Sequence, residues 1–420
     1  MPTSLSTSFC DSPVPNDVRR YPLKALEIAS GYVFGSDSET APLPHRSTAT
    51  PIAAFEAAVL EALRRPPCAV AFSGGRDSSA VLAVAVAAAR RENLALPIPV
   101  TLRFPESAES EESTWQERVL GHLQLEDWVR LEITDELDCV GPFATAALRR
   151  HGLFWPANAH LLIPLLDVVP HGSLLTGDGG DLAFEPASWA VRPLAVLGRQ
   201  VRPTPRDVLR LGFALSPPLV RLAVLRRRER QPVPCPWLQP DALRAIDEAW
   251  RSDVAHEPLR LDAKVDWGWR LRPVQMALET FHLLAADADV QLVHPFNTPR
   301  FLASMSQAAR AFRFADRKRA MRWLFSDLLP DEISARSTKA GFRDVFWNRH
   351  SAAFAEEWHG EGADPELVKV DVLRALWRSA GAREHFRSCT QLQAAWLAQQ
   401  VESAGSAGDR AEQPVSRIGH

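Results

Sequence analysis

Residues 68–79 read CAVAFSGGRDSS, and this stretch decides the fold. The apolar run 68–72 predicts a buried β-strand, which ends abruptly in Ser73, Gly74 and Gly75. A helical pattern of small apolar residues follows at once. Glycines let the backbone turn sharply and leave room for a ligand to approach closely. The free N–H groups at the start of the new helix favour an anion such as phosphate.

A carboxylate inside this turn adds information about the ligand. Asp77 would repel a bare phosphate, so its presence indicates a Mg²⁺ ion between the two groups. The chain contains no GxxxxGK[ST] sequence, so the turn is not a Walker A loop. An ordinary strand-to-helix turn also needs glycines, but the order of strand, SGGRDSS and helix favours nucleotide binding.

The rest of the N-terminal half alternates strands with helices. Further strands are predicted at 97–104, 127–133 and 173–176, separated by helical stretches. This alternation predicts an α/β fold, a parallel sheet with helices on both faces, and ligands at the carboxyl ends of the strands. From residue 186 onward the pattern is nearly all helical.

Composition limits the possible partners and the compartment. The net charge of -3 over 420 residues gives no reason to expect a nucleic-acid or membrane partner. The longest apolar run, 80–89, is too short to cross a bilayer, and the N-terminus has no signal pattern. The five cysteines form no CxxC pair, and an odd, scattered set predicts a cytoplasmic location.

A second strand-end loop repeats the logic of the first. Residues 173–181 read SLLTGDGGD, a strand followed by glycines that carry carboxylates. Alone, this pattern is also typical of a plain turn. Beside the first loop, Asp181 becomes the second carboxylate that holds Mg²⁺ together with Asp77.

Lysine is rare in this chain. Only five of its 48 basic residues are lysine, and two of these, Lys318 and Lys339, follow the second loop in basic segments. A compact ammonium group can neutralise a phosphate or a developing negative charge. A surface cation is the alternative for Lys318, whereas the glycine-containing segment around Lys339 favours a functional role.

Taken in order, five motifs resemble the synthetase domain of the asparagine synthetase family. They read SGGRDSS, VTLRF, TGDGGDL, HPFN and KRAMRWLFSDLLPDEISARSTKAGF, and they span roughly residues 52–345. This family belongs to the PP-loop ATP pyrophosphatase superfamily, with an adenine nucleotide alpha-hydrolase-like fold. Its relatives include β-lactam synthetases and lasso-peptide cyclases.

The resemblance implies ATP and Mg²⁺ as cofactors and assigns residues to them. Pyrophosphate would be held by the first loop, at Ser73, Gly74, Gly75, Asp77 and Ser78. The AMP site would be lined by Leu102, Thr176 and Gly177, and Mg²⁺ would be bound by Asp77 and Asp181.

Three candidate catalytic residues follow from the same resemblance. Lys339 would stabilise the adenylation and amide-forming transition states, and Lys318 is a second candidate cation. Asp178 would help to deprotonate the amine. It stands where the family has a glutamate. Two further departures are Leu182, in place of a second glutamate, and Asn297, where the family has leucine. Together these three departures put aspartate as a substrate in doubt.

The motifs predict an ATP-dependent ligase that converts a carboxylate to an acyl-adenylate and then to an amide. The alternatives are a peptide or natural-product cyclase and a nucleotide-binding module that has lost catalysis. Position 2 is Pro2 instead of a nucleophilic cysteine, so we expect no glutaminase activity. The amine would be ammonia, a partner-delivered amine or an internal amine, and a separate amidotransferase or precursor peptide is a possible partner.

These predictions divide the chain into four parts. Residues 1–50 would be a short N-terminal segment and linker without a glutaminase domain, and 51–350 the synthetase domain. Residues 351–402 would be a helical extension, and 403–420 a disordered tail.

Overall fold

The computed structural model describes most of the chain. The described residues are 21–44, 47–107, 110, 112–228, 234–309, 317–334, 336, 341, 345–379 and 385–411, the last ten by backbone only. Cys10 and Lys339 lie outside the described residues.

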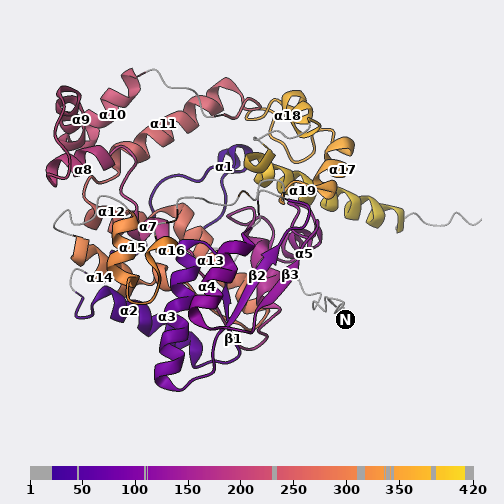
Figure 1. Cartoon of the computed structure of the whole chain (residues 1–420). Coiled ribbons are helices and arrows are strands. Elements are labelled where there is room, and N and C mark those ends of the chain that lie inside the picture. Colours follow the sequence, from indigo (N-terminus) through magenta and orange to yellow (C-terminus); the bar gives the residue numbers. More distant parts are fainter. Residues whose placement is uncertain are drawn as a thin grey trace, which may run out of the picture.

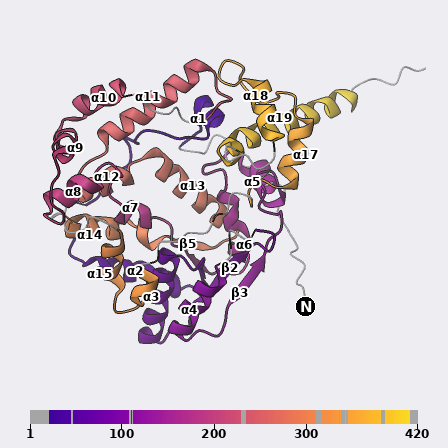
Figure 2. The ribbon, with the colours of Figure 1, turned by 45° about the horizontal axis from the view of Figure 1, so that its top comes forward.

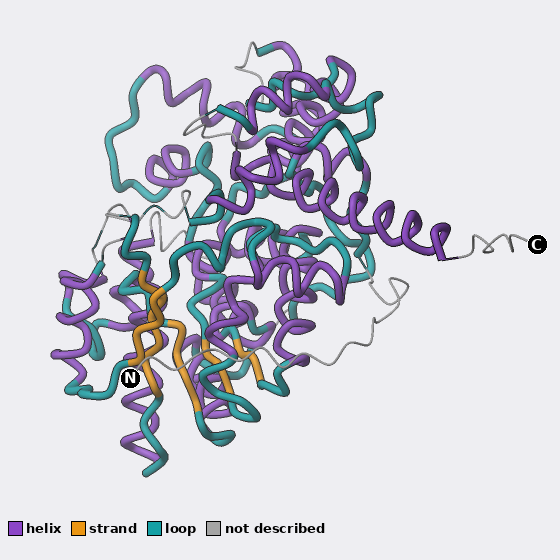
Figure 3. Tube along the Cα trace, turned by 90° about the vertical axis from the view of Figure 1, so that its right-hand side faces the viewer, coloured by secondary structure: helices purple, strands orange, loops and turns teal. Residues whose placement is uncertain are grey.

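The core of the fold is a five-stranded parallel sheet. Its strands are β1 (Cys68–Ala71), β2 (Ile98–Arg103), β3 (Val129–Glu132), β4 (Ser173–Leu175) and β5 (Gln291–Val293). They lie side by side in the order β3-β2-β1-β4-β5, and each neighbouring pair is parallel. Figure 3 shows the strands gathered in one half of the molecule. The prediction of a parallel α/β sheet is confirmed, although β5 was not predicted.

Helices make up most of the remaining structure. In the N-terminal half they are α1 (Ala25–Ser30), α2 (Pro51–Leu63), α3 (Arg76–Glu92), α4 (Ser113–Leu123), α5 (Pro142–His151), η3 (Ala159–Leu162), α6 (Ile163–Leu166), α7 (Gly180–Phe184), α8 (Val191–Leu197) and α9 (Pro205–Leu215). In the C-terminal half they are α10 (Pro218–Arg227), α11 (Pro240–His256), α12 (Leu261–Trp269), α13 (Arg272–Asp287), η4 (Pro295–Asn297), α14 (Pro299–Ala309), α15 (Arg317–Phe325), α16 (Asp331–Ser334), α17 (Arg349–Glu357), α18 (Val370–Trp377) and α19 (His385–Ala411).

This arrangement confirms a mostly helical C-terminal part. Figures 1 and 2 show α8 to α10 and α17 to α19 at opposite ends of it. Helix α19 continues to Ala411, so the prediction of a tail from residue 403 is wrong for its first residues. Extending a formed helix costs little, because each added residue gains one hydrogen bond. None of the described helices is long and apolar enough to cross a membrane.

Alternate strand residues face opposite cores, which puts helices on both faces of the sheet. Ala69 and Leu174 join one buried cluster with residues of α5 and α13. Their neighbours Val70 and Leu175 join another with residues of α2, α3 and α14. Successive side chains of a strand point to opposite faces, so strands covered on both faces are apolar throughout.

The order of the strands creates a switch point between β1 and β4. The chain runs from β1 outward to β2 and β3, then returns to the other side of β1 for β4 and β5. The register pairs Cys68 with Ser173 and Val70 with Leu175, so β1 and β4 end side by side. Open α/β sheets bind ligands in the crevice at such a point. Both glycine-rich loops follow these two strands.

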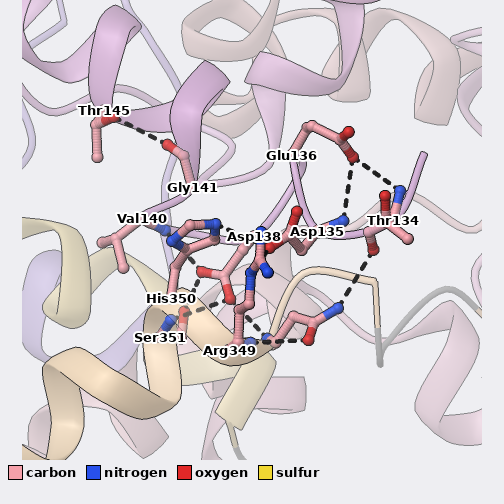
Figure 4. Close-up of polar contacts among 11 residues, drawn as sticks. Thr134, Asp135, Glu136, Asp138, Val140, Gly141, Thr145, Arg349, His350 and Ser351 are labelled. Atoms are coloured by element: carbon pink, nitrogen blue, oxygen red, sulfur yellow. Dashed lines mark hydrogen bonds and ion pairs between the residues drawn. The ribbon is translucent and has the colours of Figure 1, made fainter.

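The C-terminal helices attach to the carboxyl end of β3 through a buried aspartate (Figure 4). Asp138 accepts hydrogen bonds from the backbone N–H groups of Val140 at 3.0 Å, Asn348 at 2.7 Å and Ser351 at 3.0 Å. It also accepts one from the Ser351 hydroxyl. Because Asn348 and Ser351 lie at the start of α17, the aspartate fixes that helix against the segment that follows β3.

Two further links join the same parts of the chain. Asp135 pairs with Arg349 and, at 3.0 Å, with Nε2 of His350. Cys139 and Cys389 form a disulfide with a Cα–Cα distance of 6.0 Å. The scattered cysteines gave no prediction of this pair. Their separation of 250 residues left no local signal in the sequence.

Candidate active site at the switch point

The first loop is held in shape by its own serines. Gly74 has φ +79°, in the left-handed region that favours glycine. The hydroxyl of Ser73 lies 3.1 Å from that of Ser78 and accepts a hydrogen bond from Gly75 N at 3.3 Å. The Ser78 hydroxyl donates to the carbonyl of Gly75 at 3.2 Å. Within the described chain no side chain caps α3, so its first N–H groups are available to an anion.

The second loop packs directly on the first, at two glycines that leave no room for a side chain. A Cβ added at Gly177 would lie 2.8 Å from the backbone nitrogen of Ser78. One added at Gly180 would lie 2.7 Å from the carboxyl group of Asp77. The structure thus brings together the loop residues that the sequence assigned to pyrophosphate, AMP and Mg²⁺.

An arginine that sequence reasoning missed connects the two predicted metal ligands. Arg317, the first residue of α15, donates one terminal nitrogen to Asp77 and the other to Asp181. The second nitrogen also reaches Glu185 at 2.8 Å. Helix α15 lies beside α7, which carries Asp181, in both Figures 1 and 2. The two aspartates are therefore close enough to share one cation.

The donor set fits Mg²⁺ that is held jointly with a nucleotide. Burial raises the pKa of the Asp77 carboxyl, and Arg317 opposes that shift. Asp77 Oδ1 is buried and has no hydrogen-bond partner among the described residues. No group of three or more His, Cys, Asp or Glu in the described part of the chain could hold a metal ion alone. Mg²⁺ commonly takes one or two carboxylates and completes its shell with phosphate oxygens and water.

Asp178 belongs to a short polar chain at the end of β4. The Thr176 hydroxyl donates to Asp178 Oδ2 at 3.0 Å and lies 2.6 Å from Nδ1 of His294. Burial lowers the pKa of His294 to about 3, so its ring is neutral at physiological pH. A neutral ring whose Nδ1–H donates to Thr176 leaves the threonine hydrogen for Asp178. This network fixes the Asp178 carboxylate in one orientation.

Asp178 remains accessible in spite of these contacts. Desolvation by the surrounding protein raises the pKa of its carboxyl group, and the Thr176 bond opposes this shift. Because 53% of the side chain is exposed, solvent screens much of the effect. An oriented, accessible carboxylate can accept a proton from an incoming amine.

Two of the remaining predicted residues are described. Leu102 lies in the second half of β2, opposite Leu131 of β3, and packs partly buried against the core. Lys318 is exposed on α15, directly after Arg317. The roles of Lys318 and of Lys339 stay predictions.

Residues that are distant in the sequence bind the carbonyl groups of the first loop. Arg336 donates to the carbonyl of Gly74 at 2.9 Å and forms a buried ion pair with Glu112 at 2.7 Å. Gln116 donates to the carbonyl of Ser73 at 3.2 Å. These contacts fix the carbonyl groups of Ser73 and Gly74, so the loop is held in shape from outside as well as by its own serines. Glu112 and Arg336 lie 224 residues apart, so no local pattern could pair them.

Two departures from the family pattern have structural explanations. Leu182 packs against α12 so closely that a Cβ at Gly268 would lie 2.2 Å from its side chain. Asn297 lies against Gly179, where an added Cβ would be 2.4 Å from the asparagine side chain. Leu182 thus serves packing, and Asn297 forms part of the wall beside the second loop.

The parallel α/β sheet and the paired glycine loops at its switch point agree with the family comparison. A family model described as asparagine synthase matches residues 53–400. The match covers most of the chain, so the chain belongs to the asparagine synthase family, whose members are ATP-dependent amidation synthetases. A search of curated proteins found no match. The resemblance that the five motifs predicted is confirmed.

Proposed function

We propose that this chain is an ATP-dependent, AMP-forming ligase that makes an amide bond. A substrate carboxylate oxygen attacks the α-phosphorus of ATP, the bond to the β-phosphate breaks, and pyrophosphate leaves. An amine nitrogen then attacks the acyl carbon, the bond to AMP breaks, and the amine loses a proton. The observation that carries this proposal is the contact between two aspartate-bearing glycine loops at the β1/β4 switch point.

The groups that the chain provides at the two loops are suited to holding pyrophosphate as it leaves. The N–H groups at the start of α3 and the loop Ser73–Ser78 would hold the leaving phosphates, with the loop fixed beforehand by Gln116 and Arg336. Asp77 and Asp181 would hold Mg²⁺, which supplies charge neutralisation for the triphosphate when bound. Lys318 and Lys339 are candidates for further positive charge.

The second half-reaction needs a proton acceptor beside the acyl group. Asp178 has the orientation and the exposure for this role. AMP would contact Gly177, Thr176 and Leu102, which lie at or near the carboxyl ends of β4 and β2. The Asp178 carboxylate would therefore lie on the AMP side of the crevice, where the acyl group is attacked.

The substrate pair is the open part of the proposal. The carboxylate is a small molecule or a peptide, and the amine is ammonia, a partner-delivered amine or an amine within the substrate. An internal amine would make the protein a cyclase. A separate amidotransferase or a precursor peptide is the corresponding partner.

ATP–pyrophosphate exchange tests the proposal across a panel of amino acids, small acids and peptides. We expect one class of carboxylate to start exchange of labelled pyrophosphate into ATP in the presence of Mg²⁺. Asp77→Asn should remove that exchange, and Asp241→Asn, at an exposed carboxylate of α11, should keep it. Tight ATP binding without exchange for any carboxylate would contradict catalysis and indicate a nucleotide-binding module.

A further inference from the structure

Arg317 occupies the space between the two aspartates that the proposed function assigns to Mg²⁺. We propose that Arg317 is an internal counter-ion, which competes with a divalent cation for Asp77 and Asp181 and is displaced when metal and nucleotide bind together. The inference rests on the proposed function only in taking a divalent cation as the natural occupant of this pair.

The burial and charge of this cluster support the competition. The Arg317 side chain is 10% exposed, and its two terminal nitrogens bind three carboxylates, those of Asp77, Asp181 and Glu185. Arg76 also interacts electrostatically with these three carboxylates, so two guanidinium groups face three carboxylates and leave one negative charge in excess. This excess of negative charge favours a further cation at the Arg317 cluster.

The two cations cannot share the aspartates. A Mg²⁺ ion contacts carboxylate oxygens at about 2.0–2.1 Å. Asp77 Oδ2 and Asp181 Oδ1 already accept hydrogen bonds from Arg317. A metal ion at the same oxygens would meet the guanidinium at close range, where two positive charges repel strongly in a partly buried site. Metal binding therefore requires Arg317 to leave at least one aspartate.

Glu185 and the nucleotide provide new partners for the displaced side chain. The nitrogen that binds Asp181 also binds Glu185, so Arg317 keeps one carboxylate after it leaves the aspartates. Its Nε is buried without a partner among the described residues, which leaves a donor for a ligand oxygen. A planar guanidinium binds phosphate oxygens through two parallel bonds. Metal and nucleotide should thus help each other to bind.

Mn²⁺ binding to the full chain, measured by electron paramagnetic resonance without nucleotide, tests the competition. Arg317→Gln, which removes the charge but keeps hydrogen-bonding groups, should bind Mn²⁺ about tenfold or more tightly than the wild type. Arg322→Gln, on the same helix but paired with exposed Asp331, should match the wild type. With saturating ATP the difference in Mn²⁺ affinity between Arg317→Gln and the wild type should become smaller, because ATP and metal together displace Arg317 in the wild type.

Equal or weaker Mn²⁺ affinity in Arg317→Gln would overturn the inference, since Arg317 would then not oppose the metal. Arg317→Lys provides a second variant that keeps the charge, and it should stay within about threefold of the wild type. If it bound as tightly as Arg317→Gln, charge competition would be excluded. These measurements need no carboxylate and no turnover. A lack of pyrophosphate exchange would therefore count against the proposed function alone.

Discussion

Two aspartates, Asp138 and Asp77, lie at the carboxyl edge of the same sheet and differ in how they are satisfied. Asp138 is fully buried and accepts four hydrogen bonds, three of them from backbone N–H groups. Asp77 has one oxygen on Arg317 and one with no partner among the described residues. Buried polar groups in proteins are normally paired, so an exception needs an explanation.

In our proposal, this difference separates a carboxylate that holds the fold from one that serves a ligand. The junction between β3 and α17 is complete within the chain, because every donor around Asp138 belongs to the protein. At the β1/β4 switch point, by contrast, Asp77 Oδ1 has no hydrogen-bond partner and no side chain caps α3 among the described residues. The predictions below test that contrast, in order of expected effect.

The largest effect should come from the metal-binding pair. Asp77→Asn and Asp181→Asn should each lower the rate of ATP–pyrophosphate exchange by about 10³-fold, because the charge that the triphosphate needs is lost. Asp241→Asn is the matched control. Unchanged exchange in either variant at saturating Mg²⁺ would show that the two aspartates do not share a metal.

The structural aspartate should affect stability instead. Asp138→Asn places an amide where four donors converge, so some of them lose their acceptor. We expect a loss of about 3 kcal/mol in the free energy of unfolding, measured by urea denaturation with tryptophan fluorescence. A midpoint equal to that of the wild type would remove the contrast between Asp138 and Asp77.

Lys339 should act on the transition state more than on binding. Lys339→Ala should lower kcat by about 10²-fold and change ATP affinity far less. Lys339→Arg should not restore the rate, because a planar guanidinium does not replace a compact ammonium. A variant with raised KM and normal kcat would make Lys339 a binding residue.

The smallest effect concerns the stability of Asp77→Asn. Burial raises the pKa of Asp77 in the folded state, so its charge destabilises the fold at neutral pH and protonation relieves that cost as pH falls. The neutral asparagine should leave the urea midpoint at pH 7 unchanged or higher. The difference in urea midpoint between Asp77→Asn and the wild type should become smaller as the pH falls through the pKa of Asp77. A lower midpoint at pH 7 would mean that Asp77 holds the fold as Asp138 does.

Much of the site could be predicted because it lies in continuous segments. SGGRDSS and TGDGGD each contain their own turn, and alternation of strands with helices places both at one sheet edge. Strand β5 is as short as β4, but it is followed by HPFN instead of a glycine-rich loop, so it was missed.

The contacts between distant segments could not be predicted. Arg317 meets Asp77 across 240 residues, and Arg336 reaches Gly74 across 262. Arg336 lies within the fifth motif and Arg317 directly before it, but nothing in these segments indicates which residue either arginine contacts. The free thiol of Cys68 is a simpler case. Its apolar strand predicted burial, and burial raises its pKa to about 11, as expected for an inert thiol.

Binding of α,β-methylene ATP, measured by calorimetry with and without Mg²⁺, tests the central claim most directly. This claim is that Asp77 serves a metal–nucleotide ligand and Asp138 serves the fold. Mg²⁺ should strengthen binding to the wild type and to folded Asp138→Asn alike. In Asp77→Asn the increase in analogue affinity that Mg²⁺ causes should be smaller than in the wild type by about tenfold or more. An equal gain from Mg²⁺ in the wild type and Asp77→Asn would contradict the account.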